Sequence, residues 1–222
     1  MTSNDLAAGG DRLRITEIFL SLQGESRSIG WPTVFIRLTG CPLRCTYCDT
    51  EYAFSGGEWV SLKKILVQVA TYGTQHVCVT GGEPLAQKNC LLLLTRLADV
   101  GHNVSLETSG ALDIHRVDFR VIKVMDIKTP GSGELSRNRL ENIRLLKAQD
   151  QVKFVLCDRK DYEWAKNLLR ELCIDKICEV LFSPVYSQLE PSQLAEWILA
   201  DKLPVRFQIQ LHKILWGEQS GR

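Results

Sequence analysis

The sequence predicts one α/β domain built as an open, partial (β/α)6-type barrel of parallel strands with pared-down helices. Short apolar segments alternate with segments of helical periodicity, which is the pattern of a parallel sheet with right-handed crossovers. The chain holds about six such units, too few for a closed eight-stranded barrel, which needs about 250 residues. Polar residues recur where the predicted strands end, and in parallel α/β folds this edge carries the chemistry.

The elements of the first half follow in order. Residues 15–21 predict a first strand, and residues 33–38 a second, since they are β-branched and aromatic and lie between Pro32 and Gly40. Ser61 predicts the cap of a helix that runs to about Tyr72. A buried strand at 76–80 and an apolar helix at 87–100, ended by a glycine, come next.

The second half continues the alternation. Strands are predicted at 103–107, 121–127, 152–156, 179–182 and 205–209, and helices at 138–149, 161–173 and 192–200. Polar segments follow four of the strands, at 40–50, 80–84, 107–110 and 126–133. We therefore expect these segments to meet at one edge of the sheet.

Net charge and composition constrain the possible partners and the cellular location of the protein. The 27 Lys and Arg residues and 26 Asp and Glu residues leave a net charge of +1, so no strong field points to a nucleic-acid or membrane partner. The start is polar and glycine-rich, without the apolar segment of a signal peptide, which predicts a cytoplasmic protein. We expect a disordered tail at 1–12, a single domain at 13–216 and a second tail at 217–222. In the cytoplasm the eight cysteines should be mostly reduced.

The most informative segment is the loop after the second strand, Cys41-Pro-Leu-Arg-Cys45-Thr-Tyr-Cys48. Its three thiolates can converge, and soft sulfur ligands suit an iron–sulfur cluster. A [4Fe-4S] cluster takes four ligands, so three cysteines would leave one iron open to another group. The alternatives are structural zinc, which usually takes four ligands in C-x2-C pairs, and cysteines buried by chance. No second close pair is present, and the residues between the cysteines are too polar for a core segment.

This spacing resembles the radical S-adenosylmethionine (SAM) superfamily. Thr80-Gly-Gly-Glu-Pro84 resembles its GGE segment, and Glu107-Thr-Ser-Gly110 its ribose-contacting segment. Taken alone, each could be an ordinary turn or strand end; their order after the cysteine loop favours the functional interpretation. The resemblance implies that the open iron is chelated by SAM, and that the reduced cluster cleaves SAM to a radical that abstracts hydrogen from the substrate.

Within that superfamily the chain resembles the 7-carboxy-7-deazaguanine synthase family, from about residue 15 to residue 216. The matching segments are Ser21–Glu25, Pro32–Leu38, Cys48–Thr50, Asp126–Gly133, Gln151–Val155, Ser183–Pro184 and Gln210–Lys213. The resemblance implies conversion of 6-carboxy-5,6,7,8-tetrahydropterin to 7-carboxy-7-deazaguanine with loss of ammonia, on the route to deazapurines such as queuosine. It also implies a [4Fe-4S] cluster on Cys41, Cys45 and Cys48, SAM used catalytically, and Mg²⁺.

The resemblance places substrate contacts on Leu22, Gln23, Gly24, Glu25, Arg37, Thr80 and His212. Gln and Glu side chains can pair with the amide edge of a pterin, and a guanidinium matches a carboxylate in shape. Arg37 is unusual within an apolar strand, although an outward-facing strand residue would look the same. His212, beside apolar residues, could equally be structural.

By the same resemblance, SAM contacts fall on Tyr47, Gly82, Glu83, Glu107, Ser109, Asp126, Ile127 and Lys128, and a Mg²⁺ ligand on Thr50. Mg²⁺ keeps several waters and takes few protein ligands, so one hydroxyl fits. On chemistry alone, Asp49 is the more obvious ligand. The sequence predicts no catalytic residue beyond the groups that hold the cluster and SAM.

Two other functions stay open on the residues alone. A glycyl-radical-enzyme activase would share the cluster and SAM but bind a protein loop, and should not need Gln23, Glu25 and Arg37 together. A non-catalytic iron–sulfur or zinc protein would show no SAM chemistry. The family resemblance implies a small pterin substrate, a flavodoxin or ferredoxin reductant and a homodimer. Ser26 departs from the family, in which many members carry a second glycine after Gly24-Glu25.

Overall fold

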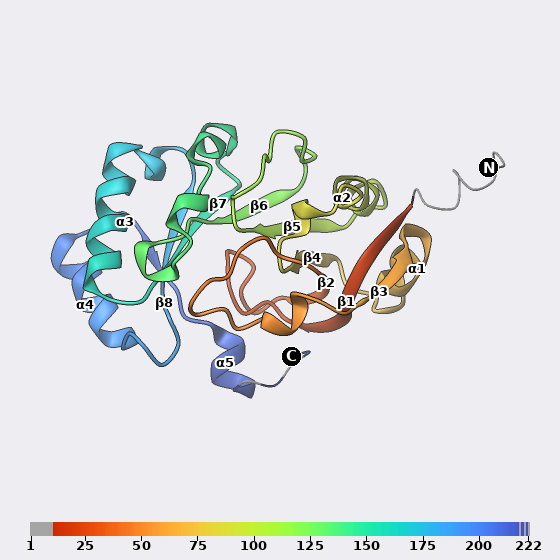
Figure 1. Ribbon diagram of the computed structural model, residues 1–222, viewed down its shortest axis with the longest axis horizontal. Helices are drawn as coiled ribbons and strands as arrows, with labels where there is room; N and C mark the ends of the chain where they lie inside the picture. Colours follow the sequence, from red (N-terminus) through yellow and green to blue (C-terminus); the bar gives the residue numbers. More distant parts are fainter. Residues whose placement is uncertain (1–10, 218, 220, 222) are drawn as a thin grey trace.

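The fold is organised by one open sheet of nine strands in the order β3-β1-β2-β4-β5-β6-β7-β8-β9 (Figure 1). The computed structural model describes residues 11–217, 219 and 221, so the expected tails fall largely outside the described residues. From β2 to β9 every neighbouring pair is parallel, whereas β1 is antiparallel to both of its neighbours, β2 and β3. The predicted parallel series therefore begins only at the second strand.

The strands lie close to their predicted positions. Their bounds are Arg12–Leu22 (β1), Pro32–Leu38 (β2), Glu58–Ser61 (β3), His76–Gly81 (β4), Asn103–Thr108 (β5), Ile122–Asp126 (β6), Gln151–Leu156 (β7), Glu179–Pro184 (β8) and Arg206–Phe207 (β9). β3 was not predicted, because a four-residue edge strand with an exposed glutamate and an exposed tryptophan has no apolar pattern.

The helices are α1 (Leu62–Thr71), α2 (Cys90–Asp99), α3 (Arg159–Glu171), α4 (Pro191–Asp201) and the unpredicted α5 (Leu211–Trp216). Ser61 caps α1 as predicted, accepting a hydrogen bond from the Lys64 amide. Short 3₁₀ segments lie at Glu51–Ala53, Pro84–Ala86, Pro130–Ser132, Leu135–Arg137, Leu140–Leu145 and Ile174–Lys176.

The prediction of an α-helix at 138–149 is wrong, since this region folds as the 3₁₀ segment Leu140–Leu145 within loop structure. The fully buried Asn142 side chain donates hydrogen bonds to the Gly110 and Leu112 carbonyls, at 2.9 and 2.8 Å. These bonds tie the segment to the chain after β5. Its path is therefore set by a tertiary contact that the local pattern does not show.

The helices pack against the sheet through a continuous apolar core. α1 and α2 lie at one end of the molecule and α3 and α4 at the other, with the strands between them (Figure 1). Tyr162, Phe154 and Phe182 are fully buried and meet edge to face, with ring centroids 5.4 and 6.0 Å apart. Leu93, Leu94 and Leu97 of α2 are also fully buried in this core.

The register of the parallel strands brings polar side chains together at their carboxyl ends. Arg37 of β2 lies opposite Thr80 of β4, and Asp126 of β6 lies opposite Lys153 of β7. Glu107 of β5 lies between these pairs and accepts a hydrogen bond from the Thr80 hydroxyl at 2.9 Å. The five residues form a row across five neighbouring strands, and this polar row is the base of the functional site.

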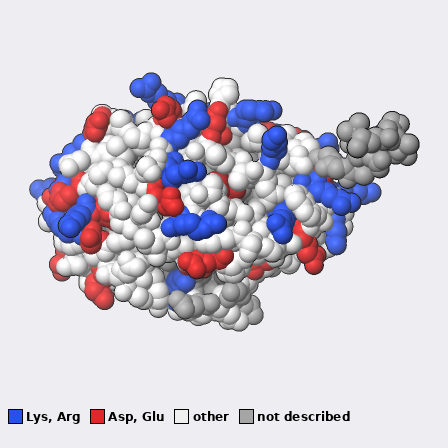
Figure 2. Space-filling view, viewed as in Figure 1, with Lys and Arg blue, Asp and Glu red and all other residues white. Residues whose placement is uncertain are grey.

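The surface carries both charges. On the face shown in Figure 2, basic and acidic side chains are interspersed, in keeping with the net charge of +1. No helix in the described part of the chain is both long and apolar enough to span a membrane.

Candidate active site

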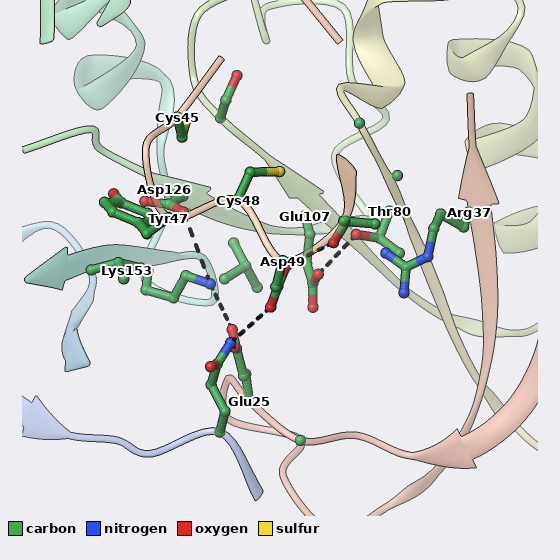
Figure 3. A pocket seen from close by; sticks show the side chains of 18 of the residues that line it. Glu25, Arg37, Cys45, Tyr47, Cys48, Asp49, Thr80, Glu107, Asp126 and Lys153 are labelled. Carbon is green, nitrogen blue, oxygen red and sulfur yellow. Dashed lines mark hydrogen bonds and ion pairs between the residues drawn. The ribbon is translucent and has the colours of Figure 1, made fainter. Parts of the chain in front are cut away.

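A cavity of about 460 Å³ opens over the polar row at the carboxyl edge of the sheet (Figure 3). Its walls are the polar row, the cysteine loop, the turn after β1 and helix α5. The predicted site residues that line it are Leu22, Gln23, Gly24, Glu25, Arg37, Cys41, Cys45, Tyr47, Cys48, Thr50, Thr80, Gly82, Glu107, Ser109, Asp126, Lys128 and His212. Segments that lie far apart in the sequence, from the turn after β1 to helix α5, thus meet in one cavity.

The cysteine loop is held mainly by contacts that do not involve its sulfurs, although the Leu43 amide donates to Cys41 Sγ at 3.5 Å. Leu43 is buried beneath it, and the Arg44 guanidinium donates to the carbonyls of Cys41 and Leu43, at 2.9 and 2.6 Å. The Thr46 hydroxyl donates to the Gly131 carbonyl at 2.7 Å, which ties the loop to the segment after β6. The three cysteines are free thiols on the cavity wall, and none of the other five cysteines lines the cavity.

The three thiols fit an iron–sulfur cluster. Burial raises the pKa of Cys41, Cys45 and Cys48, so without metal they carry protons. Iron binds the thiolate and displaces these protons. Among the described residues, no three His, Cys, Asp or Glu side chains are arranged to hold a single metal ion. Three soft ligands spread along one wall suit a larger, sulfur-rich group.

The wall beside the cysteine loop has room and donors for SAM. A Cβ at Gly82 would clash with the Gly40 carbonyl oxygen and lie 2.7 Å from Cys41 Cβ, so the turn after β4 packs directly on the loop. Asp126 Oδ2 accepts from Lys128 Nζ at 2.9 Å, while its Oδ1 is buried without a hydrogen-bond partner among the described residues. An unpaired buried acceptor costs about 1–3 kcal/mol. A ligand hydroxyl or amino group, such as SAM carries, would satisfy it.

Lys128 contributes a fixed positive charge to this wall. Burial lowers its pKa, but the nearby Asp126 and Cys45 raise it, with a net increase. The ammonium also lies 5.9 Å from the centroid of the Tyr47 ring. Burial strongly raises the pKa of Tyr47, so its hydroxyl stays protonated.

Glu83 and Ile127 lie behind the wall instead of lining the cavity. The fully buried Glu83 carboxylate accepts from the Thr108 hydroxyl at 2.9 Å and from the Ser109 amide and hydroxyl at 2.7 and 2.6 Å. It fixes the end of β5, where Ser109 faces the cavity. The buried Ile127 donates its amide to the Lys153 carbonyl at 2.9 Å. Direct SAM contacts of these two residues stay predictions.

On the opposite side, the turn after β1 presents amide and carboxylate groups. Gln23 Nε2 donates to Glu107 Oε1 at 3.3 Å, and Glu25 accepts from Lys153 Nζ at 2.6 Å and Gln210 Nε2 at 2.8 Å. Burial raises the pKa of Glu25, but the charge and hydrogen bond of Lys153 outweigh it and hold the pKa below its ordinary value. Glu25 is therefore an ionised acceptor with a largely buried side chain in the cavity.

The Arg37 side chain is held in place by an acidic residue and two aromatic rings. Its Nε donates to Glu17 Oε1 at 2.7 Å, and the rings of Phe19 and Tyr52 lie 5.9 and 5.8 Å from the guanidinium carbon. Figure 3 shows the guanidinium turned into the cavity, on the same side as Thr80 and Glu107. Phe19 also stacks on Phe35, with centroids 5.2 Å apart. This corner combines an anion-binding group with the flat apolar surface that a heterocycle needs.

Thr50 and Asp49 offer oxygen ligands next to the cysteine loop. The Thr50 hydroxyl donates to Asp49 Oδ1 at 2.7 Å, and both residues line the cavity. Burial raises the pKa of Asp49. The hydrogen bond from Thr50 and the charges of Lys213 and Lys153 outweigh this effect and lower the pKa, so the carboxylate is ionised. Hard oxygen donors in small number suit Mg²⁺, which completes its shell with water and ligand oxygens.

Helix α5 closes one side of the cavity. The Leu211 amide donates to the Gly24 carbonyl at 3.0 Å, and His212 lies so close that a Cβ at Gly24 would clash with its Nδ1. Gly24 is therefore required for this close approach. The contact brings His212 into the cavity beside the turn, as its predicted role requires.

Sequence reasoning missed several cavity residues, namely Phe19, Phe35, Lys153 and Gln210. Lys153 had a usable signal, because a lysine in the middle of an apolar strand is as unusual as Arg37. The two phenylalanines had no such signal, since aromatic strand residues are ordinary in a core. Gln210 opens the family-like segment Gln210–Lys213, which was the signal that could have found it.

Comparison with known proteins agrees with this geometry. The model of the "Radical SAM superfamily" matches residues 35–125. A 7-carboxy-7-deazaguanine synthase of Chlorobaculum tepidum is 45% identical over 92% of this chain and 94% of its own length. One of Koribacter versatilis is 40% identical over 94% and 99%. The crystal structure of QueE from Escherichia coli matches with a TM-score of 0.72 and 26% identity, over 95% of this chain and 99% of that one.

Proposed function

Because the chain belongs to the 7-carboxy-7-deazaguanine synthase family of the radical SAM superfamily, we propose that its cavity holds cluster, SAM and pterin together. The enzyme converts 6-carboxy-5,6,7,8-tetrahydropterin to 7-carboxy-7-deazaguanine with loss of ammonia, in deazapurine and queuosine biosynthesis. As a radical SAM enzyme it uses a [4Fe-4S] cluster and SAM. When bound, these two groups supply the radical that abstracts hydrogen from the substrate.

The observation that carries the residue assignments is the polar row facing the cysteine loop. Cys41, Cys45 and Cys48 would hold the cluster on one wall. Gly82, Glu107, Ser109, Asp126 and Lys128 would hold SAM next to it, and Asp126 Oδ1 would accept a hydrogen bond that no described residue supplies. The substrate would then lie on the far side of SAM from the cluster, over the turn after β1.

The substrate side matches the pterin group by group. The Arg37 guanidinium would pair with the substrate carboxylate, and its Nε bond to Glu17 would hold it in place. Gln23 would donate and accept hydrogen bonds at the amide and amino edge of the ring, where the ionised Glu25 would only accept them. Phe19 and Phe35 offer apolar ring faces in the same cavity, and His212 covers the turn from α5.

The proposal includes a Mg²⁺ ion, with the Thr50 hydroxyl as a ligand. This hydroxyl lies on the cavity wall and donates to Asp49, so the oxygens of both residues are available to the ion at the same place. A Mg²⁺ ion there would bridge the protein to a substrate oxygen and keep its remaining waters.

The electron donor, the assembly and the compartment complete the proposal. A flavodoxin or ferredoxin would reduce the cluster, and two copies would form a homodimer. Exposed Leu20 and Trp59 on β1 and β3 support an interface at that edge of the sheet. The free thiol state of all eight cysteines suits the reducing cytoplasm.

The decisive experiment is an anaerobic assay of the reconstituted protein with dithionite, SAM, Mg²⁺ and 6-carboxytetrahydropterin. The expected result is the mass of 7-carboxy-7-deazaguanine, without any protein substrate. Cleavage of SAM without this product would reject the pterin as substrate. An intact, reduced cluster that leaves SAM uncleaved would reject the radical reaction itself.

A further inference from the structure

Lys153 is a buried cation that lies between two subsites. It projects from the middle of β7 into the cavity, where its ammonium lies 2.6 Å from Glu25 Oε2 and 3.9 Å from Asp126 Oδ2 (Figure 3). The Lys153, Glu25 and Asp126 side chains are only 13, 11 and 18% exposed. In such surroundings a charge interaction is screened much less than at the surface.

The two contacts of Lys153 differ in strength. The contact with Glu25 is short and hydrogen-bonded. The contact with Asp126 is at the outer limit of an ion pair, because Lys128 already binds the same carboxylate oxygen at 2.9 Å. The Glu25–Lys153–Asp126 bridge therefore has one tight end and one loose end.

The turn that carries Glu25 does not depend on Lys153 for its backbone. Ser26 donates its amide to Gln208 Oε1 at 2.8 Å and accepts from Gln208 Nε2 at 3.0 Å. The Gly24 carbonyl accepts from the Leu211 amide at 3.0 Å. Removing the ammonium should therefore leave the turn in place and free only Glu25 Oε2, because Gln210 Nε2 still donates to Glu25 Oε1 at 2.8 Å.

We infer that Lys153 is a positioning residue that couples the pterin and SAM subsites, so that either ligand makes the other bind more tightly. The inference rests on the proposed function, which assigns Glu25 to the pterin and Asp126 to SAM. The first ligand to bind restrains its own carboxylate and, through the ammonium, the other one. The second ligand then meets a bridge that is already ordered and loses less conformational freedom. By thermodynamic linkage the effect on the two affinities is the same factor.

The test measures this factor directly in the holoenzyme. With the cluster oxidised, so that SAM is not cleaved, calorimetry gives the Kd of SAM with and without saturating 6-carboxypterin. For the wild-type protein we expect the Kd of SAM to fall by about fivefold or more, in the usual range of coupling between sites. For Lys153→Met we expect less than a twofold change, with the Kd of SAM alone within about threefold of wild type.

Two further variants separate coupling from general damage. Lys153→Arg retains the charge and should restore most of the coupling. Lys166→Met removes a lysine that pairs with Asp201 at 3.0 Å outside the cavity, and should behave as wild type. Iron content and circular dichroism report whether each variant assembles. If Lys153→Met does not, Glu25→Gln breaks the same bridge from the other side and should abolish the coupling.

The outcomes are distinct. Wild-type coupling retained in Lys153→Met, or no coupling in a wild-type enzyme that makes product, would overturn the inference and leave the proposed function intact. A wild-type protein that neither binds 6-carboxypterin nor forms carboxydeazaguanine would overturn both.

Discussion

Several charged residues of the cavity each lie next to a partner of opposite charge. Glu25 has Lys153, Asp126 has Lys128 and Arg37 has Glu17, each within 2.9 Å. A buried charge without such a partner would be costly and would tend to neutralise by a pKa shift. The pairs thus let largely buried side chains present fixed charges to a polar substrate.

Thr50 can be tested through the metal alone. Thr50→Ala should raise the Mg²⁺ concentration that gives half-maximal activity by about tenfold or more, because a metal ligand is lost while its neighbour Asp49 stays. The affinity for SAM should not change. Thr50→Ser keeps the hydroxyl and serves as the matched control. An unchanged magnesium response in Thr50→Ala would show that another group, such as Asp49, binds the ion.

The elements around the site are held together by close contacts between their ends. The turn after β1 meets α5 at Gly24, and the end of β5 meets the turn after β4 at Glu83. Ser26, where the family resemblance leads us to expect glycine, adopts the left-handed conformation with φ +67°. That conformation favours glycine, and here the Gln208 side chain, bonded to both the amide and carbonyl of Ser26, holds it.

The contact between α5 and the turn predicts the effect of Gly24→Ala. The added methyl group would clash with His212 Nδ1 and push α5 away from the turn, so kcat/KM should fall by about tenfold or more. Limited proteolysis should cleave the C-terminal segment faster. Adding His212→Ala removes the nearest obstacle and should restore the resistance to proteolysis in part. Resistance equal to wild type in the single variant would show that α5 does not need this contact.

Glu83 predicts a stability effect at the end of β5. Glu83→Ala leaves the donors of the buried Thr108 and the half-buried Ser109 without their acceptor, which should lower the free energy of unfolding by about 2–4 kcal/mol. Urea denaturation of the apoprotein measures it. Glu51→Ala, an exposed acidic residue, is the control and should change stability by less than about 0.5 kcal/mol. A loss of SAM binding in Glu83→Ala without a loss of stability would instead favour direct contact with SAM.

At the scale of the whole molecule, we expect the fold not to depend on the cluster. The core runs along the whole sheet, and the cysteine loop is held by Leu43, Arg44 and Thr46 without any cysteine side chain acting as the main anchor. A chain of 222 residues buries enough apolar surface to fold without a metal staple.

Cys45→Ala tests this independence. Iron incorporation and SAM cleavage should fall to background, because a three-thiolate site becomes a two-thiolate site. The thermal midpoint of the apoprotein should stay within about 3 °C of wild-type apoprotein, as expected for a half-buried side chain outside the core. An active cluster in this variant would contradict the ligand assignment, and a collapse of the apoprotein would contradict the independence of the fold.

Local pattern was sufficient for much of this description. The alternation of strands and helices predicted the open parallel sheet, because each strand and amphipathic helix carries its own periodicity. The cysteine spacing and the polar strand ends predicted the location of the site, because the carboxyl ends of parallel strands meet at one edge. These properties depend on residues close together in the chain.

Only the tertiary structure decided what depends on residues far apart. It made β1 antiparallel, folded 138–149 around the Asn142 side chain, and turned Glu83 toward β5 instead of the cavity. It also brought Lys153 between Glu25 and Asp126, residues of three separate segments. Periodicity in a sequence tells which side of an element is buried, but not which distant group it will meet, because that partner is chosen by packing and register across the whole sheet.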